Sequence, residues 1–235
     1  MNPQLFHIEH ISYIVITTVL SCTLLILVKK FVKNEKHIQI ILKCLAVGLL
    51  LSILTNRVCN SFDNGKFLWF KLIPDSYCGM TSLILSLSIL IGKKNNPVYH
   101  FVWLSGLFGG IATVIYPLFI TYHSSFFHPI TLSGLLHHSF TGTLIVALLL
   151  FKQIEITYKK WYYVILGFTC YITLGAFLMS VFNVSDAYHI VEPLLPDSPF
   201  TVWGMGPIYV VVHGLIFLII ELVRFFKQKK ERTNE

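Results

Sequence analysis

The chain has 235 residues, of which 55% are hydrophobic and only 12% are charged, and its formal net charge is +7. A soluble domain carries about 25% charged residues, so this composition excludes a soluble globular protein and indicates an all-α polytopic membrane protein. The positive charges lie in short loops without an aromatic-interleaved basic patch. We therefore expect them to contact anionic lipid headgroups and not nucleic acid.

Seven apolar segments follow one another along the sequence, each near the length of about 20 residues that a bilayer-crossing α-helix needs. They leave no room for a soluble domain, so we predict one integral membrane domain over residues 1–235, ending in a basic tail at 227–235. The expected helices span about 11–28, 38–56, 73–91, 99–121, 132–151, 161–182 and 205–226.

The loops between these segments predict the orientation of the chain. The loops of one side hold fourteen Lys and Arg residues, whereas those of the other side hold Arg57, Lys66 and Lys71. Positively charged loops stay in the cytoplasm, so we expect a multi-pass protein of the cell membrane with its N-terminus outside and its C-terminus in the cytoplasm. The first segment lacks a basic n-region and a cleavage site, which favours a retained helix over a signal peptide.

Two loops on the predicted outer side, 57–72 and 184–204, mix aromatic, charged and proline residues. This mixture suits the headgroup interface. Two interpretations stay open: the loops anchor the protein at the interface, or they form a lid over a mouth that faces lipid. As a lid, the second loop would bring Asp186 and Trp203 to the substrate.

The fourth segment carries a stripe of small residues that ends in a proline. Gly106, Gly109, Gly110 and Thr113 fall on one narrow face, which allows another helix backbone to approach closely. Pro117 is expected to kink this helix near its outer end.

Most of the ten histidines lie in the outer half of the chain, where Cys78 stands about one helical turn inside the third segment. On the fifth segment, His137 and His138 share a face with Gly134 and Thr141. With a rise of 1.5 Å per residue, Cys78 and both histidines lie roughly 7 to 10 Å below the outer interface. Helix packing can therefore bring the thiol and the imidazoles into contact.

A cysteine acts as a nucleophile when a neighbouring imidazole takes its proton and a third group orients that imidazole. We predict Cys78 as the nucleophile, His138 or His137 as the base, and Asn183 or Asp186 as the third group. Thiolate attack on an ester needs neither a metal nor a nucleotide, so we expect no cofactor and expect membrane phospholipids as partners. A buried structural thiol remains the alternative interpretation.

Two other functions stay open. Zinc bound by His10, His137 or His138, and His213 would resemble the seven-helix lipid hydrolases of the ceramidase and progestin-receptor type, but their Ser-x-x-x-His and His-x-x-x-His patterns are absent, so no metal ligand is assigned. In a non-catalytic lipid- or ligand-binding membrane protein, the histidines would serve packing or pH sensing. In the leading hypothesis, His10 and His213 contact the substrate.

The order of landmarks resembles the YwaF-type family of bacterial integral membrane proteins and, more distantly, the eukaryotic transmembrane protein 164. The landmarks span nearly the whole chain. They are Glu9-His10, Ile73-Pro74 followed by Cys78, the glycine-rich fourth segment ending in Tyr116-Pro117, the pair His137 and His138, Asn183, and Gly206-Pro207-Ile208-Tyr209.

The resemblance implies a seven-helix bundle that transfers acyl chains between phospholipids through a cysteine acyl intermediate. It implies Cys78 as the nucleophile and His137 or His138 as the base. The bacterial motif reads Leu-Pro-Leu-His before its cysteine, and this chain lacks that histidine. The leading hypothesis is a membrane-embedded lipid acyltransferase or acyl hydrolase whose site opens to the outer leaflet.

Overall fold

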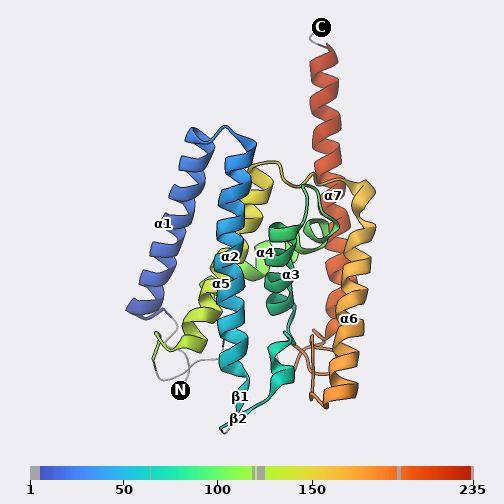
Figure 1. The fold of residues 1–235 in the computed structure, drawn as a ribbon. Helices are drawn as coiled ribbons and strands as arrows, with labels where there is room; N and C mark the ends of the chain where they lie inside the picture. Colours follow the sequence, from blue (N-terminus) through green and yellow to red (C-terminus); the bar gives the residue numbers. More distant parts are fainter. Residues whose placement is uncertain (1–5, 64, 118–119, 121–124, 195–196, 234–235) are drawn as a thin grey trace. The chain divides into compact units, whose positions relative to one another are not determined.

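The computed structural model describes residues 6–63, 65–117, 120, 125–194 and 197–233 (Figure 1). These residues form an all-α protein with seven α-helices and one small β-hairpin. The helices are α1 (Ile8–Phe31), α2 (Glu35–Asn60), α3 (Tyr77–Ile91), α4 (Pro97–Ile115), α5 (Pro129–Leu150), α6 (Tyr162–Phe182) and α7 (Val202–Thr233). The shorter elements are β1 (Phe62–Asp63), β2 (Lys66–Phe67) and the 3-10 turns η1 (Trp69–Leu72) and η2 (Tyr158–Lys160).

Six of the seven described helices are long and apolar enough to cross a membrane, which makes this a polytopic membrane protein. The exception is α3, which has 15 residues. The contacts divide the chain into two compact units, Met1–Gln153 with α1 to α5 and Ile154–Glu235 with α6 and α7.

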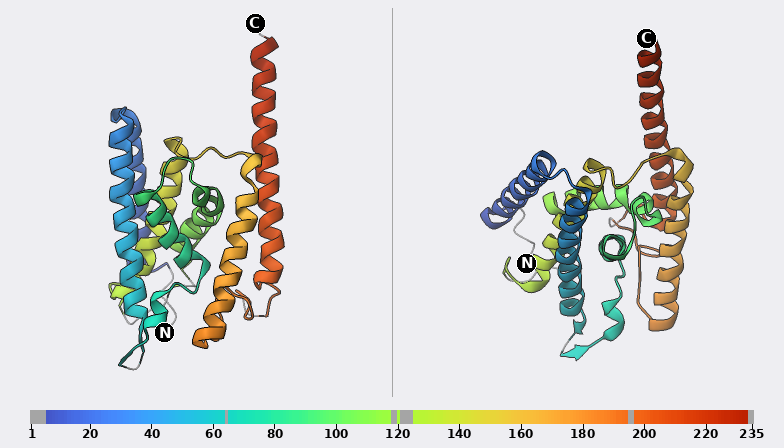
Figure 2. Two further views of the ribbon diagram at one scale, coloured as in Figure 1. Left: turned by 45° about the vertical axis from the view of Figure 1, so that its right-hand side comes forward. Right: turned by 45° about the horizontal axis from the view of Figure 1, so that its top comes forward.

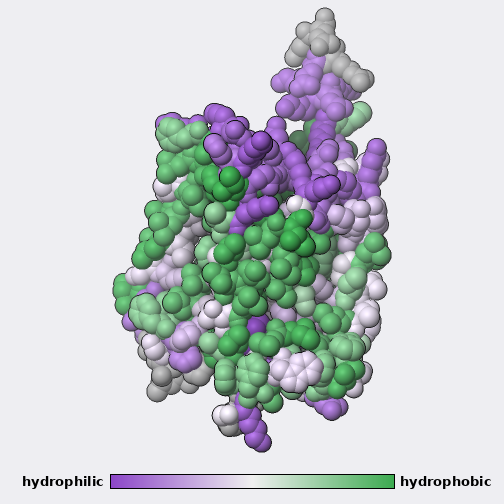
Figure 3. Space-filling view, viewed as in Figure 1, coloured by the Kyte–Doolittle hydropathy of each residue, from purple (hydrophilic) through white to green (hydrophobic). Residues whose placement is uncertain are grey.

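In the first unit, α2 and α4 each pack against both α3 and α5, and α1 packs against α5 (Figures 1 and 2). The centre of this packing is aliphatic, with Leu49, Leu85 and Leu144 fully buried. Apolar side chains also cover the outer sides of α1 and α2, whereas hydrophilic ones gather where α1 leads into α2 (Figure 3). This is the distribution expected of a helix bundle whose outer surface faces lipid.

Polar caps and prolines set where the helices of the first unit begin. Asn96 accepts a hydrogen bond from the Val98 N–H in front of α4, and the Nδ1 of His128 accepts one from the Ile130 N–H in front of α5. Both helices then open with a proline, whose missing N–H costs nothing at the first helical position. The expected segments from about 99 and from about 132 therefore begin a few residues earlier.

Among the described residues of the first unit, Pro74 and Pro117 lie outside helices. Pro74 precedes α3, which starts at Tyr77 behind the cap Ser76, and not at 73. The kink expected at Pro117 is wrong, because α4 ends at Ile115 and Tyr116 leaves the helical conformation with φ −132° and ψ 79°. The residue before a proline is pushed out of the α region. Residues 118, 119 and 121 of the expected fourth helix lie outside the described residues.

The glycines of α4 allow the close helix contacts that the sequence predicts. A Cβ on Gly110 would lie 2.8 Å from the backbone nitrogen of Gly142 in α5, and one on Gly106 would lie 3.1 Å from Ile145. Gly109 faces a different helix, since a Cβ there would meet Cys78 of α3. The small residues of α4 therefore allow close contact with two helices, α5 and α3.

In the second unit, α6 packs against α7, and η2 contacts both helices. α7 runs through Pro207 without ending and continues to Thr233, so most of the expected tail at 227–235 is helical. Arg224 and Glu221 pair across one turn of this helix, with Nη1 and Oε1 3.2 Å apart.

Candidate active site

A buried arginine fixes the start of α3. Arg57, near the end of α2, places its Nη1 3.1 Å from the Oδ1 of Asp75 and donates from Nε to the Lys71 carbonyl at 3.0 Å. These bonds tie the segment before α3 to α2, and the Oγ of Ser76 then accepts from the Gly79 N–H to cap α3. Cys78 is thereby held at the second position of this helix.

The sulfur of Cys78 packs against Gly109 of α4. A Cβ built on Gly109 would lie 3.1 Å from the Sγ, so a larger residue would fit only if the sulfur moved slightly. The imidazole of His138 makes a hydrogen bond with the backbone of the same glycine. The thiol and the imidazole, from α3 and α5, therefore meet at one residue of α4.

Among the described residues, Cys78 makes no hydrogen bond to His137 or His138. Its side chain is partly buried, whereas both imidazoles are buried. Catalytic contacts are often longer in a ligand-free site and tighten when substrate is present. The assignment of Cys78 as nucleophile stays a prediction.

Two hydroxyls surround His137: Thr141, which the sequence places on the same helix face, and Ser82 of α3. The Oγ of Ser82 lies 3.0 Å from the His137 Nδ1 and 2.8 Å from the Thr141 Oγ1. Thr141 donates its own proton to the His137 carbonyl at 2.7 Å. All three residues are buried, so these groups depend on one another for hydrogen bonds.

The donor and acceptor of each hydrogen bond in this row of three side chains follow from counting protons. Each hydroxyl has one proton to donate. Since Thr141 uses its proton on a carbonyl, it accepts from Ser82, and Ser82 accepts in turn from the His137 Nδ1–H. The neutral imidazole of His137 therefore carries its proton on Nδ1 and keeps a lone pair on Nε2. Ser82 cannot act as a nucleophile that His137 activates in this arrangement.

A family model described as the TMEM164 family matches residues 5–224. The chain belongs to the TMEM164 family. Neither a curated protein nor a solved structure matches the chain. The resemblance to transmembrane protein 164 is thus confirmed, and the bacterial YwaF name is compatible with it.

The hydroxyl chain of this TMEM164-family protein is testable by a matched pair of substitutions. Ser82→Ala leaves the buried Nδ1–H of His137 without an acceptor, which costs about 1–3 kcal/mol in the free energy of unfolding. Ser86 is the control, because it is equally buried on the same helix and donates only to the Leu83 carbonyl of its own turn. Thermal unfolding in detergent should show a larger loss for Ser82→Ala than for Ser86→Ala. Equal losses would contradict the hydroxyl chain.

His10 joins two helices of this family member, and its predicted contact with a substrate stays a prediction. Its Nδ1 accepts from the Phe6 N–H at 3.3 Å, and its Nε2 lies 2.9 Å from the Val114 carbonyl, so it links α1 to α4. Both ring nitrogens are occupied, which leaves no lone pair for zinc. Among the described residues, no three His, Cys, Asp or Glu side chains are placed to hold a metal ion.

The other predicted site residues lie in the second unit of the TMEM164-family chain. Asn183 ends α6 in the left-handed conformation, with φ 53° and ψ 35°, which asparagine adopts at helix ends. The carboxylate of Asp186 accepts from the Val191 N–H, and the indole N–H of Trp203 donates to the Ile190 carbonyl. His213 is buried between the rings of neighbouring turns, Tyr209 and Phe217. Their roles toward a substrate stay predictions.

Proposed function

We propose that this TMEM164-family membrane protein transfers or hydrolyses the acyl chains of membrane phospholipids, with Cys78 as the nucleophile. The observation that carries the proposal is the meeting of the Cys78 sulfur and the His138 imidazole at Gly109. The family supports it, because the resemblance to transmembrane protein 164 implies a cysteine acyl intermediate.

His138 suits the role of base better than His137 does. When a neutral imidazole donates from one ring nitrogen to the Gly109 carbonyl, its other nitrogen carries the lone pair that a base needs. A base needs such an orienting partner on its far side. His137 is also oriented, through Ser82, but only His138 shares its contact residue with the thiol.

In the proposed reaction, His138 takes the proton of the Cys78 thiol, and the thiolate attacks the carbonyl carbon of a phospholipid ester. A C–S bond forms, the ester C–O bond breaks, and the leaving oxygen takes the proton from the imidazolium to give a lysophospholipid. A second hydroxyl, from a lysophospholipid or from water, then loses its proton to His138 and attacks the thioester. The new C–O bond forms as the C–S bond breaks and the thiolate regains the proton.

The negative charge of each tetrahedral intermediate needs hydrogen-bond donors. Cys78 lies in the first turn of α3, where backbone N–H groups have no acceptor within the helix. Such groups stabilise a developing oxyanion. The distribution of Lys and Arg favours a site that opens to the outer leaflet.

The intermediate is the sharpest test of this proposal. Purified protein in phospholipid vesicles is treated with a thiol-directed lipid-ester probe, and the labelled residues are mapped by mass spectrometry. We expect an acyl group on Cys78 that hydroxylamine removes. The exposed Cys44 and Cys170 serve as internal controls and should stay unlabelled.

Two results would contradict the proposal. Equal labelling of Cys78 and the exposed cysteines would mean that the probe reports thiol accessibility and not catalysis. Absence of label at Cys78 would favour the non-catalytic lipid-binding protein.

A further inference from the structure

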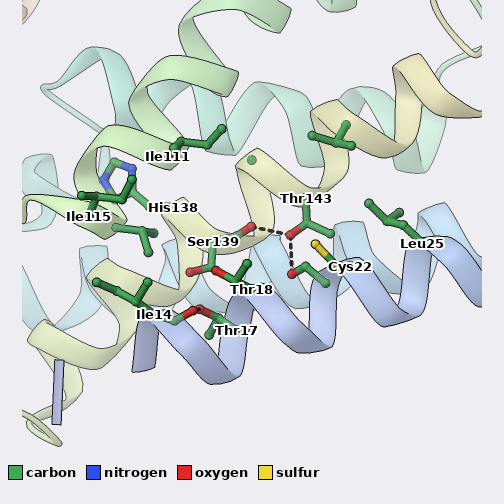
Figure 4. A pocket seen from close by; sticks show the side chains of 15 residues that line it. Ile14, Thr17, Thr18, Cys22, Leu25, Ile111, Ile115, His138, Ser139 and Thr143 are labelled. Carbon is green, nitrogen blue, oxygen red and sulfur yellow. Dashed lines mark hydrogen bonds between the residues drawn. The ribbon is translucent and has the colours of Figure 1, made fainter. Parts of the chain in front are cut away.

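A cavity of about 350 Å³ lies between α1, α4 and α5 of the first unit (Figure 4). Along α1 it is lined by residues from Ile14 to Leu25, and along α5 by residues from His138 to Val146. Ile111 and Val114 of α4 close it on the third side. Figure 4 shows His138 near one end of this row of side chains and Leu25 at the other.

The lining of this cavity is suited to hydrocarbon. It contains no Asp, Glu, Lys or Arg. Its hydroxyls are largely occupied by one another or by the backbone: Ser21 lies 2.8 Å from Thr143, Ser139 lies 2.8 Å from the Tyr13 hydroxyl, and Thr17 donates to the Tyr13 carbonyl. Such groups present mainly their methyl and methylene surface to a ligand. A charged headgroup would lose its hydration here without compensation.

The dimensions of the cavity favour one lipid chain. The eleven-residue step from Ile14 to Leu25 corresponds to about 16 Å along a helix axis. One leaflet of a bilayer with a hydrocarbon core of about 30 Å is about 15 Å thick. The volume is at the lower end of the roughly 300–1,000 Å³ of small-molecule sites, which suits a single chain and not a whole two-chain lipid.

His138 connects this cavity to the thiol. Its imidazole lines the cavity and also bonds to the backbone of Gly109, against which the Cys78 sulfur packs. The neighbouring Gly110 lines the cavity as well. A chain lying in the cavity would therefore present its ester end beside the residue that the thiol contacts.

We propose that the cavity between α1, α4 and α5 binds one acyl chain of a phospholipid, with the ester end at His138 and the methyl end toward Leu25. The reacting role of the ester rests on the proposed function. Binding of the chain itself does not, and it is tested in a Cys78→Ala protein that cannot form the acyl intermediate.

The experiment uses Cys78→Ala protein in phosphatidylcholine vesicles that contain a phosphatidylcholine with a photoreactive diazirine in one acyl chain. We expect cross-links at the less exposed cavity positions of α1 and α5, such as Ser21, Leu25 and Ser139. Adding Thr18→Trp fills the cavity and should lower these cross-links several-fold. Adding Val19→Trp is the matched control, because Val19 is 57% exposed and lies outside the lining.

Cross-links confined to outward residues of α1 such as Val15, Val19 and Ile26 would overturn the inference, because they report bulk lipid. An equal effect of the two tryptophans on cavity cross-links would also overturn it. Cavity cross-links in a protein whose wild type forms no acyl-cysteine would leave the chain site standing and remove the proposed reaction. Acyl-cysteine formation in the wild type without cavity cross-links would support the proposed reaction and overturn the proposed chain site.

Discussion

Replacing Cys78 by alanine is expected to lower acyl exchange between phospholipids to the background rate, a loss of more than about 10³-fold. Alanine removes the sulfur that forms the thioester in the proposed reaction. Cys78→Ser should also lose most of the activity, because a hydroxyl ionises far less readily than a thiol. Exchange of a labelled acyl chain between phospholipids, measured in vesicles with purified protein, gives the rate.

The control for this prediction is Cys170→Ala, which removes an exposed thiol of α6 and should leave the exchange rate unchanged. The Cys78 variants should also keep their unfolding temperature within a few degrees, because a partly buried thiol contributes little packing. Full exchange in both folded Cys78 variants would exclude the cysteine mechanism.

Much of this fold is predictable from the sequence because lipid imposes one simple requirement. Backbone groups in a bilayer are satisfied within helices, so each long apolar run becomes a helix. The runs that became α2 and α5 are examples, and only their ends shifted by a few residues. Pro117 was misplaced because hydropathy continues past Ile115, whereas the restriction on the residue before a proline acts on Tyr116 alone.

The sequence predicts the site's depth better than its contacts. Counting helix rise from the interface placed Cys78 and the histidine pair of α5 at one level, and the structure keeps all three in the first unit. It could not show that Gly109 lies between the thiol and His138, because that depends on the rotation of α4. The sequence pattern of a small-residue stripe is the same whether a glycine in it contacts a helix backbone or a sulfur, so the pattern does not identify the neighbour.

The hydrogen bonds of Ser82 and Arg57 were not predicted for a similar reason. Ser82 bonds to His137 across 55 residues of sequence, and Arg57 bonds to Asp75 across 18. Helical periodicity relates only residues that are close in sequence, so it does not reveal either of these pairs. A buried polar residue must find a partner, so an arginine at the end of an apolar helix is the one signal in the sequence that points to such a bond.

Replacing His138 by alanine is expected to slow formation of the acyl-cysteine by about 10²–10⁴-fold, the usual contribution of a general base. The thiol then lacks a neighbour that takes its proton. Added imidazole should restore part of the rate in His138→Ala, because it can occupy the space of the missing ring, but none in Cys78→Ala. Stopped reactions analysed by mass spectrometry measure this step separately from release of the acyl group.

Two variants complete the comparison of the histidines. His37→Ala removes an exposed imidazole at the start of α2 and should leave the rate unchanged. His137→Ala should cost less than His138→Ala, because His137 is bound to Ser82 and does not share Gly109 with the thiol. The opposite order, with rescue by imidazole in His137→Ala, would reassign the base. The proton on His137 Nδ1 would then hold the ring in place while its Nε2 takes the proton of the thiol.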